Sequence, residues 1–176
     1  MSSTSQQGSL HDGVATPDRT HIARQKYLTF HVGGECFGIG IMAVQEIIKV
    51  MPITKMPQAP SCMRGVINLR GKVIPIVDMR LRFALEQVPD TERTCIIVVE
   101  SSSVGGSVGM VVDEVSEVLD MQEESHERPP VFSGSQEKSF VSSIAKIGQR
   151  IVLILDLEST LSFIREGGLD LANLKI

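Results

Sequence analysis

Arg-Gly-Val-Ile-Asn-Leu-Arg-Gly-Lys-Val-Ile-Pro-Ile-Val-Asp occupies residues Arg64–Asp78 and has the pattern of a β-hairpin. Two apolar runs, at 66–67 and 73–77, flank a polar turn in which Gly71 can adopt the positive φ of a tight reversal. The second run is apolar at successive positions, which predicts a strand buried on both faces. Pro75 has no N–H for a ladder, so we expect it at an edge, a bulge or a rim.

The two halves of the chain repeat one pattern of strands and turns. Expected strands at 27–32 and 35–39 flank a Gly-Gly turn, and expected strands at 94–99 and 108–112 flank a Ser/Gly turn. Aligning the halves places Gly38 on Gly109, Val44 on Val115, Glu46 on Glu117, Gly71 on Gly148, and residues 73–79 on 151–157. Self-similarity of this kind is typical of one structural unit used twice.

The pattern within each unit favours a small closed barrel. Each unit has about five short strands interrupted by Gly and Pro, and closure removes exposed strand edges. One unit is small for an independent core, so we expect the two barrels to pack around a shared hydrophobic groove. The predicted fold is mostly β, with two tandem barrels of about five strands each and short helices after Asp78 and at 158–165.

The same pattern predicts how the chain is divided. The polar segment 1–26 is expected to be a disordered tail and the acidic stretch 123–130 a loop. The expected divisions are a first barrel at 27–93, a second barrel at 94–163 and a C-terminal tail at 164–176. An exchange of terminal segments between the barrels is left open.

Composition indicates a globular, cytoplasmic protein. The 176 residues are 42% hydrophobic and 22% charged, with no Trp, one Tyr and six Phe. No apolar run approaches the roughly 20 residues of a membrane span, and the N-terminus lacks a signal-peptide core. Cys36, Cys62 and Cys95 are far apart and have no Cys-x-x-Cys spacing, which predicts reduced thiols and neither a metal site nor a disulfide.

Charge is distributed unevenly along the chain. Residues 1–26 carry three basic and two acidic side chains (+1), residues 27–93 carry eight and six (+2), and residues 94–176 carry six and thirteen (−7). Such asymmetry bears on how partners are attracted and not on the fold. A nucleic-acid-binding protein would need a broader basic face.

No set of residues predicts catalysis, a cofactor or a metal. The four histidines have no nucleophile in an evident shared site, and no phosphate-binding glycine loop or calcium loop is present. The sequence therefore predicts a binding protein and not an enzyme. Two alternatives stay open: a tandem small-barrel protein that binds nucleic acid, and, less favoured, an enzyme that uses Cys62 or Cys95 as its nucleophile.

Four motifs resemble the CheW family of bacterial chemotaxis coupling proteins. They are Phe37-Gly-Ile with Val44-Gln-Glu-Ile47, Arg64-Gly-Val-Ile-Asn-Leu-Arg-Gly71, Val73-Ile-Pro-Ile-Val-Asp78, and Val111-Val-Asp113 with Val115-Ser-Glu-Val-Leu119. The resemblance covers roughly residues 27–163. It implies two five-stranded SH3-like barrels with a hydrophobic cleft, in agreement with the repeat. It also implies a scaffold that joins chemoreceptor tips to a dimeric histidine kinase, whose regulatory domain has the same fold.

The resemblance also implies which residues contact partners. The receptor-facing groove would consist of Val44, Glu46, Ile47, Arg64, Asn68, Leu69, Arg70, Cys95, Gly109 and Met110. A second kinase contact, which closes rings in receptor arrays, would involve Arg128 and Phe132. The competing interpretations are that the charges only keep strand ends soluble, and that Phe132 only caps the core of its own barrel.

Overall fold

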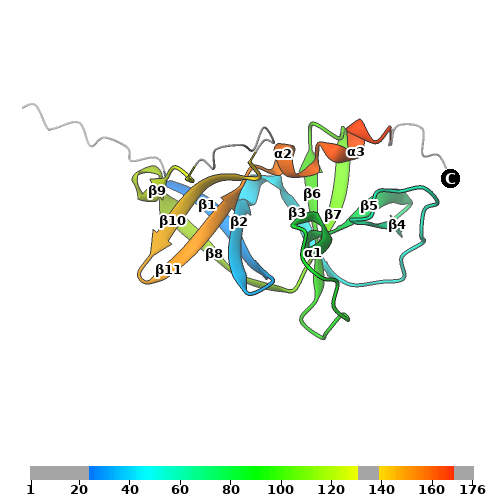
Figure 1. Cartoon of the computed structure of the whole chain (residues 1–176), viewed down its shortest axis with the longest axis horizontal. Coiled ribbons are helices and arrows are strands. Elements are labelled where there is room, and N and C mark those ends of the chain that lie inside the picture. The colour runs from blue at the N-terminus through cyan, green and yellow to red at the C-terminus, as the bar shows by residue number, and fades with distance from the viewer. Residues whose placement is uncertain (1–23, 131–138, 169–176) are drawn as a thin grey trace, which may run out of the picture.

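The computed structural model describes residues 24–130 and 139–168, which form two β-sheets side by side (Figure 1). The six-stranded sheet has the order β8-β1-β2-β11-β10-β9, with β8 Glu114–Gln122, β1 Arg24–Val32, β2 Glu35–Gly40, β11 Arg150–Leu155, β10 Val141–Ile147 and β9 His126–Glu127. The five-stranded sheet has the order β3-β6-β7-β5-β4, with β3 Val44–Lys49, β6 Cys95–Ser101, β7 Gly106–Val112, β5 Lys72–Asp78 and β4 Met63–Leu69. None of the helices in these described ranges is long and apolar enough to cross a membrane.

Each sheet closes on itself through one bent segment. In the six-stranded sheet, β8 continues through a 3₁₀ turn at Glu123–Ser125 into β9, so both edge strands belong to one stretch of chain. In the five-stranded sheet, the segment after β3 reaches β4, where Thr54 and Val66 exchange backbone hydrogen bonds of 2.9 and 2.8 Å. We call the two units the six-strand barrel and the five-strand barrel. The predicted mostly β fold is confirmed.

The strands are not divided between the barrels in chain order. The hairpin β1–β2 pairs with β8 and β11, whereas β6–β7 pairs with β3 and β5. A boundary at residue 93 therefore does not separate the barrels, and the exchange of terminal segments occurs. Local patterns could not decide this because backbone hydrogen bonds between strands are the same whichever hairpin supplies them.

Both ends of the described chain are more ordered than the sequence predicts. Arg24 and Lys26 lie in β1 opposite Gln122 and Asp120, so the strand begins before the expected Tyr27. At the other end, α2 (Leu157–Leu161) is followed by α3 (Phe163–Glu166), whose Ile164 is buried. The expected loop 123–130 also contains β9, which pairs with β10.

Side chains alternate between the two faces of each strand, and this alternation produces three apolar cores. Ile96 and Val98 of β6 face the interior of the five-strand barrel, while Ile97 and Val99 face a large core between the barrels. The six-strand barrel has its own interior of Tyr27, Met121, Ala145, Val152 and Ile154. This arrangement explains the continuous apolar runs in the sequence, because these strands are covered on both faces.

Gly38 and Gly109, which align in the two repeats, permit close approach of parallel strands. Gly38 lies where β2 pairs with β11, and Gly109 lies where β7 pairs with β5. A Cβ at Gly109 would lie 2.5 Å from Cδ1 of Ile76, and a Cβ at Gly38 would lie 2.9 Å from Cδ1 of Ile154. Neither glycine has a positive φ, so the requirement is for space and not for backbone conformation.

An aspartate at or directly after the end of the last strand of each repeat caps a short helix. Asp78 accepts hydrogen bonds from the backbone N–H groups of Arg80 and Leu81 at the start of α1 (Met79–Arg82). Asp156 accepts one from the N–H of Ser159 in α2. The predicted short helices are confirmed, and aspartate is among the residues that best satisfy the free N–H groups of a helix start.

Candidate functional site: an exposed ion pair at one end of the five-strand barrel

Glu46 and Arg70 form a bidentate ion pair between β3 and the β4–β5 turn. Nη1 of Arg70 lies 2.5 Å from Oε1 of Glu46, and Nη2 lies 2.8 Å from Oε2. The arginine side chain is 72% exposed and the glutamate side chain is 28% exposed. The hydrogen bonds from Arg70 lower the pKa of Glu46, so the carboxylate is ionised at neutral pH.

The shape of the β4–β5 turn projects Arg70 toward solvent. Arg70 and Gly71 both have positive φ, +53° and +83°, as a two-residue reversal of this hand requires. Oδ1 of Asn68 accepts a hydrogen bond of 2.9 Å from the N–H of Gly71. Asn68 therefore stabilises the turn that carries the arginine, in agreement with the hairpin predicted from sequence.

Apolar side chains lie beside the ion pair. Ile47 is 45% exposed, and it is opposite Ile97, a residue of the core between the barrels. Val44 and Leu69 are half-buried and pack against that core and the five-strand barrel interior, respectively. Ile47 therefore leaves apolar surface exposed on β3, the strand that also carries Glu46.

Met42 belongs to the same region and is missing from the residues predicted by sequence. It lies in the 3₁₀ turn Ile41–Ala43, immediately before β3, and it is 92% exposed. A methionine at this exposure offers flexible apolar surface. The sequence offered only one signal for it, an apolar side chain shortly before the motif Val44-Gln-Glu-Ile47.

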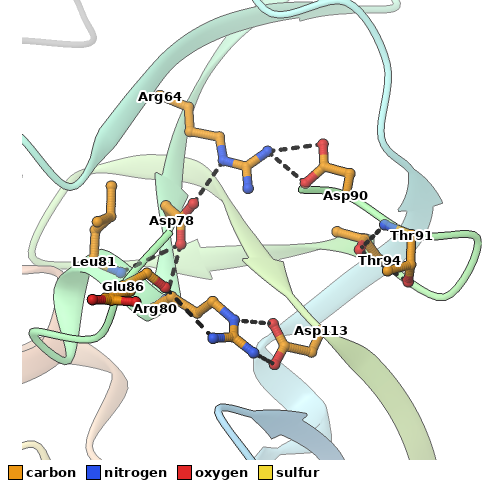
Figure 2. Close-up of polar contacts among 9 residues, drawn as sticks. All are labelled: Arg64, Asp78, Arg80, Leu81, Glu86, Asp90, Thr91, Thr94 and Asp113. Atoms are coloured by element: carbon orange, nitrogen blue, oxygen red, sulfur yellow. Dashed lines mark hydrogen bonds and ion pairs between the residues drawn. The ribbon is translucent and has the colours of Figure 1, made fainter. Parts of the chain in front are cut away.

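Arg64 does not lie with Arg70, although the resemblance places both in one groove. The two residues lie at opposite ends of β4, and Arg64 donates from Nε to Asp78 at 2.8 Å and from Nη1 to Asp90 at 3.0 Å (Figure 2). Its side chain is only 15% exposed. Arg64 also borders a pocket of about 370 Å³ whose apolar lining includes Ile53, Met63 and Leu81. The predicted groove residues therefore divide between two places on the barrel.

A second charge cluster, beside Arg64, joins the two barrels (Figure 2). Arg80 of α1 contacts Asp113 through Nε and Nη2 at 2.8 and 2.7 Å. Asp113 also accepts a hydrogen bond of 2.8 Å from the N–H of Gly33, in the turn of the exchanged hairpin β1–β2. Burial alone would raise the pKa of Asp113, but the hydrogen bonds from Arg80 and Gly33 outweigh burial and lower it. No sequence signal identified this contact.

Three residues of the predicted groove are parts of the packing. Met110 is completely buried in the core between the barrels, so its side chain has no surface for a partner. Gly109 is buried where β7 meets β5. Cys95 is half-buried opposite Lys49, three positions along β6 from Val98, the residue opposite Glu46. Met110 therefore offers no side-chain surface to a partner, because a strand covered on both faces presents its side chains to the two cores, while receptor contact by Gly109 and Cys95 stays a prediction.

The residues predicted to contact the kinase are only partly described. Arg128 is exposed after β9. Phe132 lies outside the described residues.

The described residues offer little for catalysis or metal binding. Within 24–130 and 139–168, no group of three or more His, Cys, Asp and Glu side chains could hold a metal ion. Burial raises the pKa of the thiols of Cys36, Cys62 and Cys95, and a protonated thiol is a weak nucleophile. The arrangement is suited to binding.

Comparisons with known proteins agree with the sequence motifs. The family model described as the CheW-like domain matches residues 26–165. The chain is 36% identical over 138 residues to the chemotaxis protein CheW of Klebsiella aerogenes, covering 78% of this chain and 82% of that protein. It is 37% identical over 135 residues to that of Rhizobium meliloti, covering 77% and 86%.

A solved structure is similar as well. The scaffolding protein TtCheW from Thermoanaerobacter tengcongensis superposes with a TM-score of 0.70 at 35% identity, covering 78% of this chain and 92% of that one. The residues that the family model matches, 26–165, run from β1 into α3 and so include both barrels. The chain belongs to the CheW-like family.

Proposed function

We propose that this protein is a non-catalytic adaptor that couples a chemoreceptor to a chemotaxis histidine kinase. Its partners are the helical cytoplasmic tip of the receptor and the regulatory domain of the kinase, and it acts in the cytoplasm at receptor arrays. Membership of a family with chemotaxis and scaffolding proteins supports this role. The observation that carries it is the exposed Glu46–Arg70 pair at β3, a strand that also exposes Ile47.

The ion pair and the apolar residues have different roles in receptor binding. Burial of Ile47 and Met42 against a receptor helix would supply free energy of about 25 cal/mol per Å², before the costs of association. The charges would fix the register of the helix, because a charge placed opposite the wrong partner is penalised. An exposed ion pair contributes little to folding stability, so its removal can be tested without unfolding the barrel.

The decisive variant is Glu46→Lys. It places a cation beside Arg70, and we expect roughly tenfold or weaker binding to a receptor tip fragment, measured by titration calorimetry. The thermal unfolding midpoint should stay close to that of the native protein, since the replaced side chain is at the surface. A second variant, Glu46→Lys combined with Arg70→Glu, restores an ion pair with the two charges exchanged. It tests whether receptor binding requires only an ion pair at this place or requires the acidic side chain on β3 and the basic one on the turn.

The six-strand barrel supplies a matched control. Glu117, which aligns with Glu46, forms an ion pair of 2.8 Å with Arg150 at the start of β11, and the two side chains are 48% and 50% exposed. Glu117→Lys is the same chemical change on the other barrel and should leave receptor affinity unchanged. If the two lysine variants bind the receptor fragment equally well or equally poorly, the assignment of the receptor site to Glu46 and Arg70 is wrong.

The kinase contacts are proposed from the resemblance. The five-strand barrel would dock on the kinase regulatory domain, and the region of Arg128 and Phe132 would make the contact that closes rings. The exposure of Arg128 is consistent with this role.

A further inference from the structure

Each half of the chain supplies the hairpin that completes the barrel of the other half. We define the N-terminal half as residues 24–82, with β1 to α1, and the C-terminal half as the described residues from 95 onward, with β6 to α3. The N-terminal hairpin β1–β2 lies between β8 and β11, and the C-terminal hairpin β6–β7 lies between β3 and β5. Four of the strand pairings that close the barrels therefore join one half to the other.

Neither half can close a barrel alone. Within the N-terminal half, β1 pairs only with β2, β4 pairs only with β5 and Thr54, and β3 has no partner strand. Phe30 and Ile39 on the first hairpin are buried only because the rest of the six-strand barrel and the inter-barrel core cover them. Isolated two-stranded hairpins are at best marginally stable in water. The halves are therefore complementary parts of one structure.

The link between the halves contributes little to either barrel. Residues 84–93 contain no strand or helix and are exposed. Their side-chain attachments to the barrels include the Arg64–Asp90 ion pair and a hydrogen bond of 3.5 Å from Arg80 to the carbonyl of Glu86. Closure of the barrels depends on strand pairing. The same backbone hydrogen bonds form whether the two halves come from one chain or from two.

We propose that a second copy of this chain can supply the missing half, giving a dimer by reciprocal exchange. Each pair of barrels in this dimer combines the N-terminal half of one chain with the C-terminal half of the other, and the 84–93 links cross between them. In a monomer the tether keeps the halves at high effective concentration, so the monomer dominates in dilute solution. Exchange of identical elements is a low-cost route to dimers because it creates the same contacts in a second molecule.

The first test cuts the link in the folded protein. A specific protease site replaces residues 86–89 of the full chain, which leaves Arg64 and Asp90 in place, and the folded protein is then cleaved. We expect the two fragments to co-elute in size-exclusion chromatography. The unfolding midpoint of the cleaved protein should fall with each tenfold dilution, while that of the uncut protein should not. Fragments that separate under native conditions, or a midpoint independent of concentration, would overturn the proposal.

The second test uses full chains with defects in opposite halves. Ile67→Asp destroys the interior of the five-strand barrel, and Val152→Asp destroys that of the six-strand barrel. Unfolded together and refolded as an equal mixture, the two variants can exchange halves to form one pair of barrels free of both defects. We expect a heterodimer by light scattering, with native circular dichroism restored to about half the chains.

A matched control places both defects in the same half. Ile74→Asp lies in the same barrel interior as Ile67→Asp and also in the N-terminal half, so no exchange can produce an intact N-terminal half. This mixture should not recover structure. Recovery in both mixtures, or in neither, would show that reciprocal exchange does not occur.

Discussion

Glu158 should stabilise the fold by holding the turn of the hairpin β6–β7, which lies in the five-strand barrel, whereas α2 follows β11 of the six-strand barrel. It lies in α2 and accepts hydrogen bonds from the backbone N–H groups of Ser102 and Ser103, at 3.1 and 2.7 Å, and from Oγ of Ser101 at 3.0 Å. Burial alone would raise its pKa, but these hydrogen bonds outweigh burial and lower the pKa from 4.5 to about 2. Arg80 occupies the equivalent helix position in the first repeat, directly before Leu81. It forms an ion pair with Asp113, which lies between β7 and β8.

The change to make is Glu158→Gln, which removes the charge and one acceptor oxygen. A pKa difference of about 2.5 units corresponds to roughly 3.4 kcal/mol, but partial solvation of the carboxylate reduces the expected loss to about 1–2 kcal/mol. In a protein of this size, such a loss lowers the unfolding midpoint by roughly 2–8 °C. Glu166→Gln is the control, because Glu166 is an exposed acid at the end of α3.

The pH dependence provides a second measurement of the same contact. Because the pKa is lower in the folded state, the stabilisation is complete above the unfolded-state pKa of 4.5 and is lost as the pH falls toward about 2. Urea unfolding should show the native protein and the variant converging over this interval, while the native protein and Glu166→Gln stay parallel. A constant difference between native and Glu158→Gln proteins from pH 6 to pH 2.5 would refute the assignment.

Four other substitutions test the packing, the inter-barrel contact and the ring contact. Gly109→Ala should lower the free energy of unfolding by about 1–3 kcal/mol, because the atoms closer than 3 Å to its Cβ would be side-chain atoms of Ile76 and Ile96. Gly65→Ala should lower the free energy of unfolding more than Gly109→Ala, since its φ is +141° and its Cβ would lie 2.0 Å from the carbonyl oxygen of Thr54. Thermal unfolding of both variants measures the two losses, and equal losses would contradict the packing argument. Asp113→Asn should lose about 1–2 kcal/mol in urea unfolding by weakening the contact with Arg80, whereas an unchanged midpoint would show that the pair is not stabilising. Phe132→Ser should abolish extended arrays in reconstitution with receptor and kinase while leaving one-to-one kinase binding intact; a fall of several degrees in the unfolding midpoint would instead identify Phe132 as a core residue.

Local structure was predictable wherever the residue itself carries the constraint. The turn at Gly71 follows from a conformation that glycine adopts without strain, and the helices after Asp78 and Asp156 follow from side chains that cap free N–H groups. The repeat was visible because both units need a glycine where a parallel strand approaches closely, at Gly38 and Gly109. The ion pair of the candidate site was not itself predicted, although both of its residues were named through the resemblance.

The sequence by itself determined the mostly β fold, the repeat, the hairpin turn and the capped helices, since each depends on neighbouring residues. Only the tertiary structure decided which hairpin completes which barrel, because strand pairing uses backbone groups that are alike in both repeats. It also decided that Met110 is core and that Arg64 and Arg70 lie at opposite ends of β4. The contact of Arg80 with Asp113 joins the two halves, and that of Glu158 with Ser103 joins the helix after β11 to a hairpin of the other barrel, so both depend on which hairpin completes which barrel.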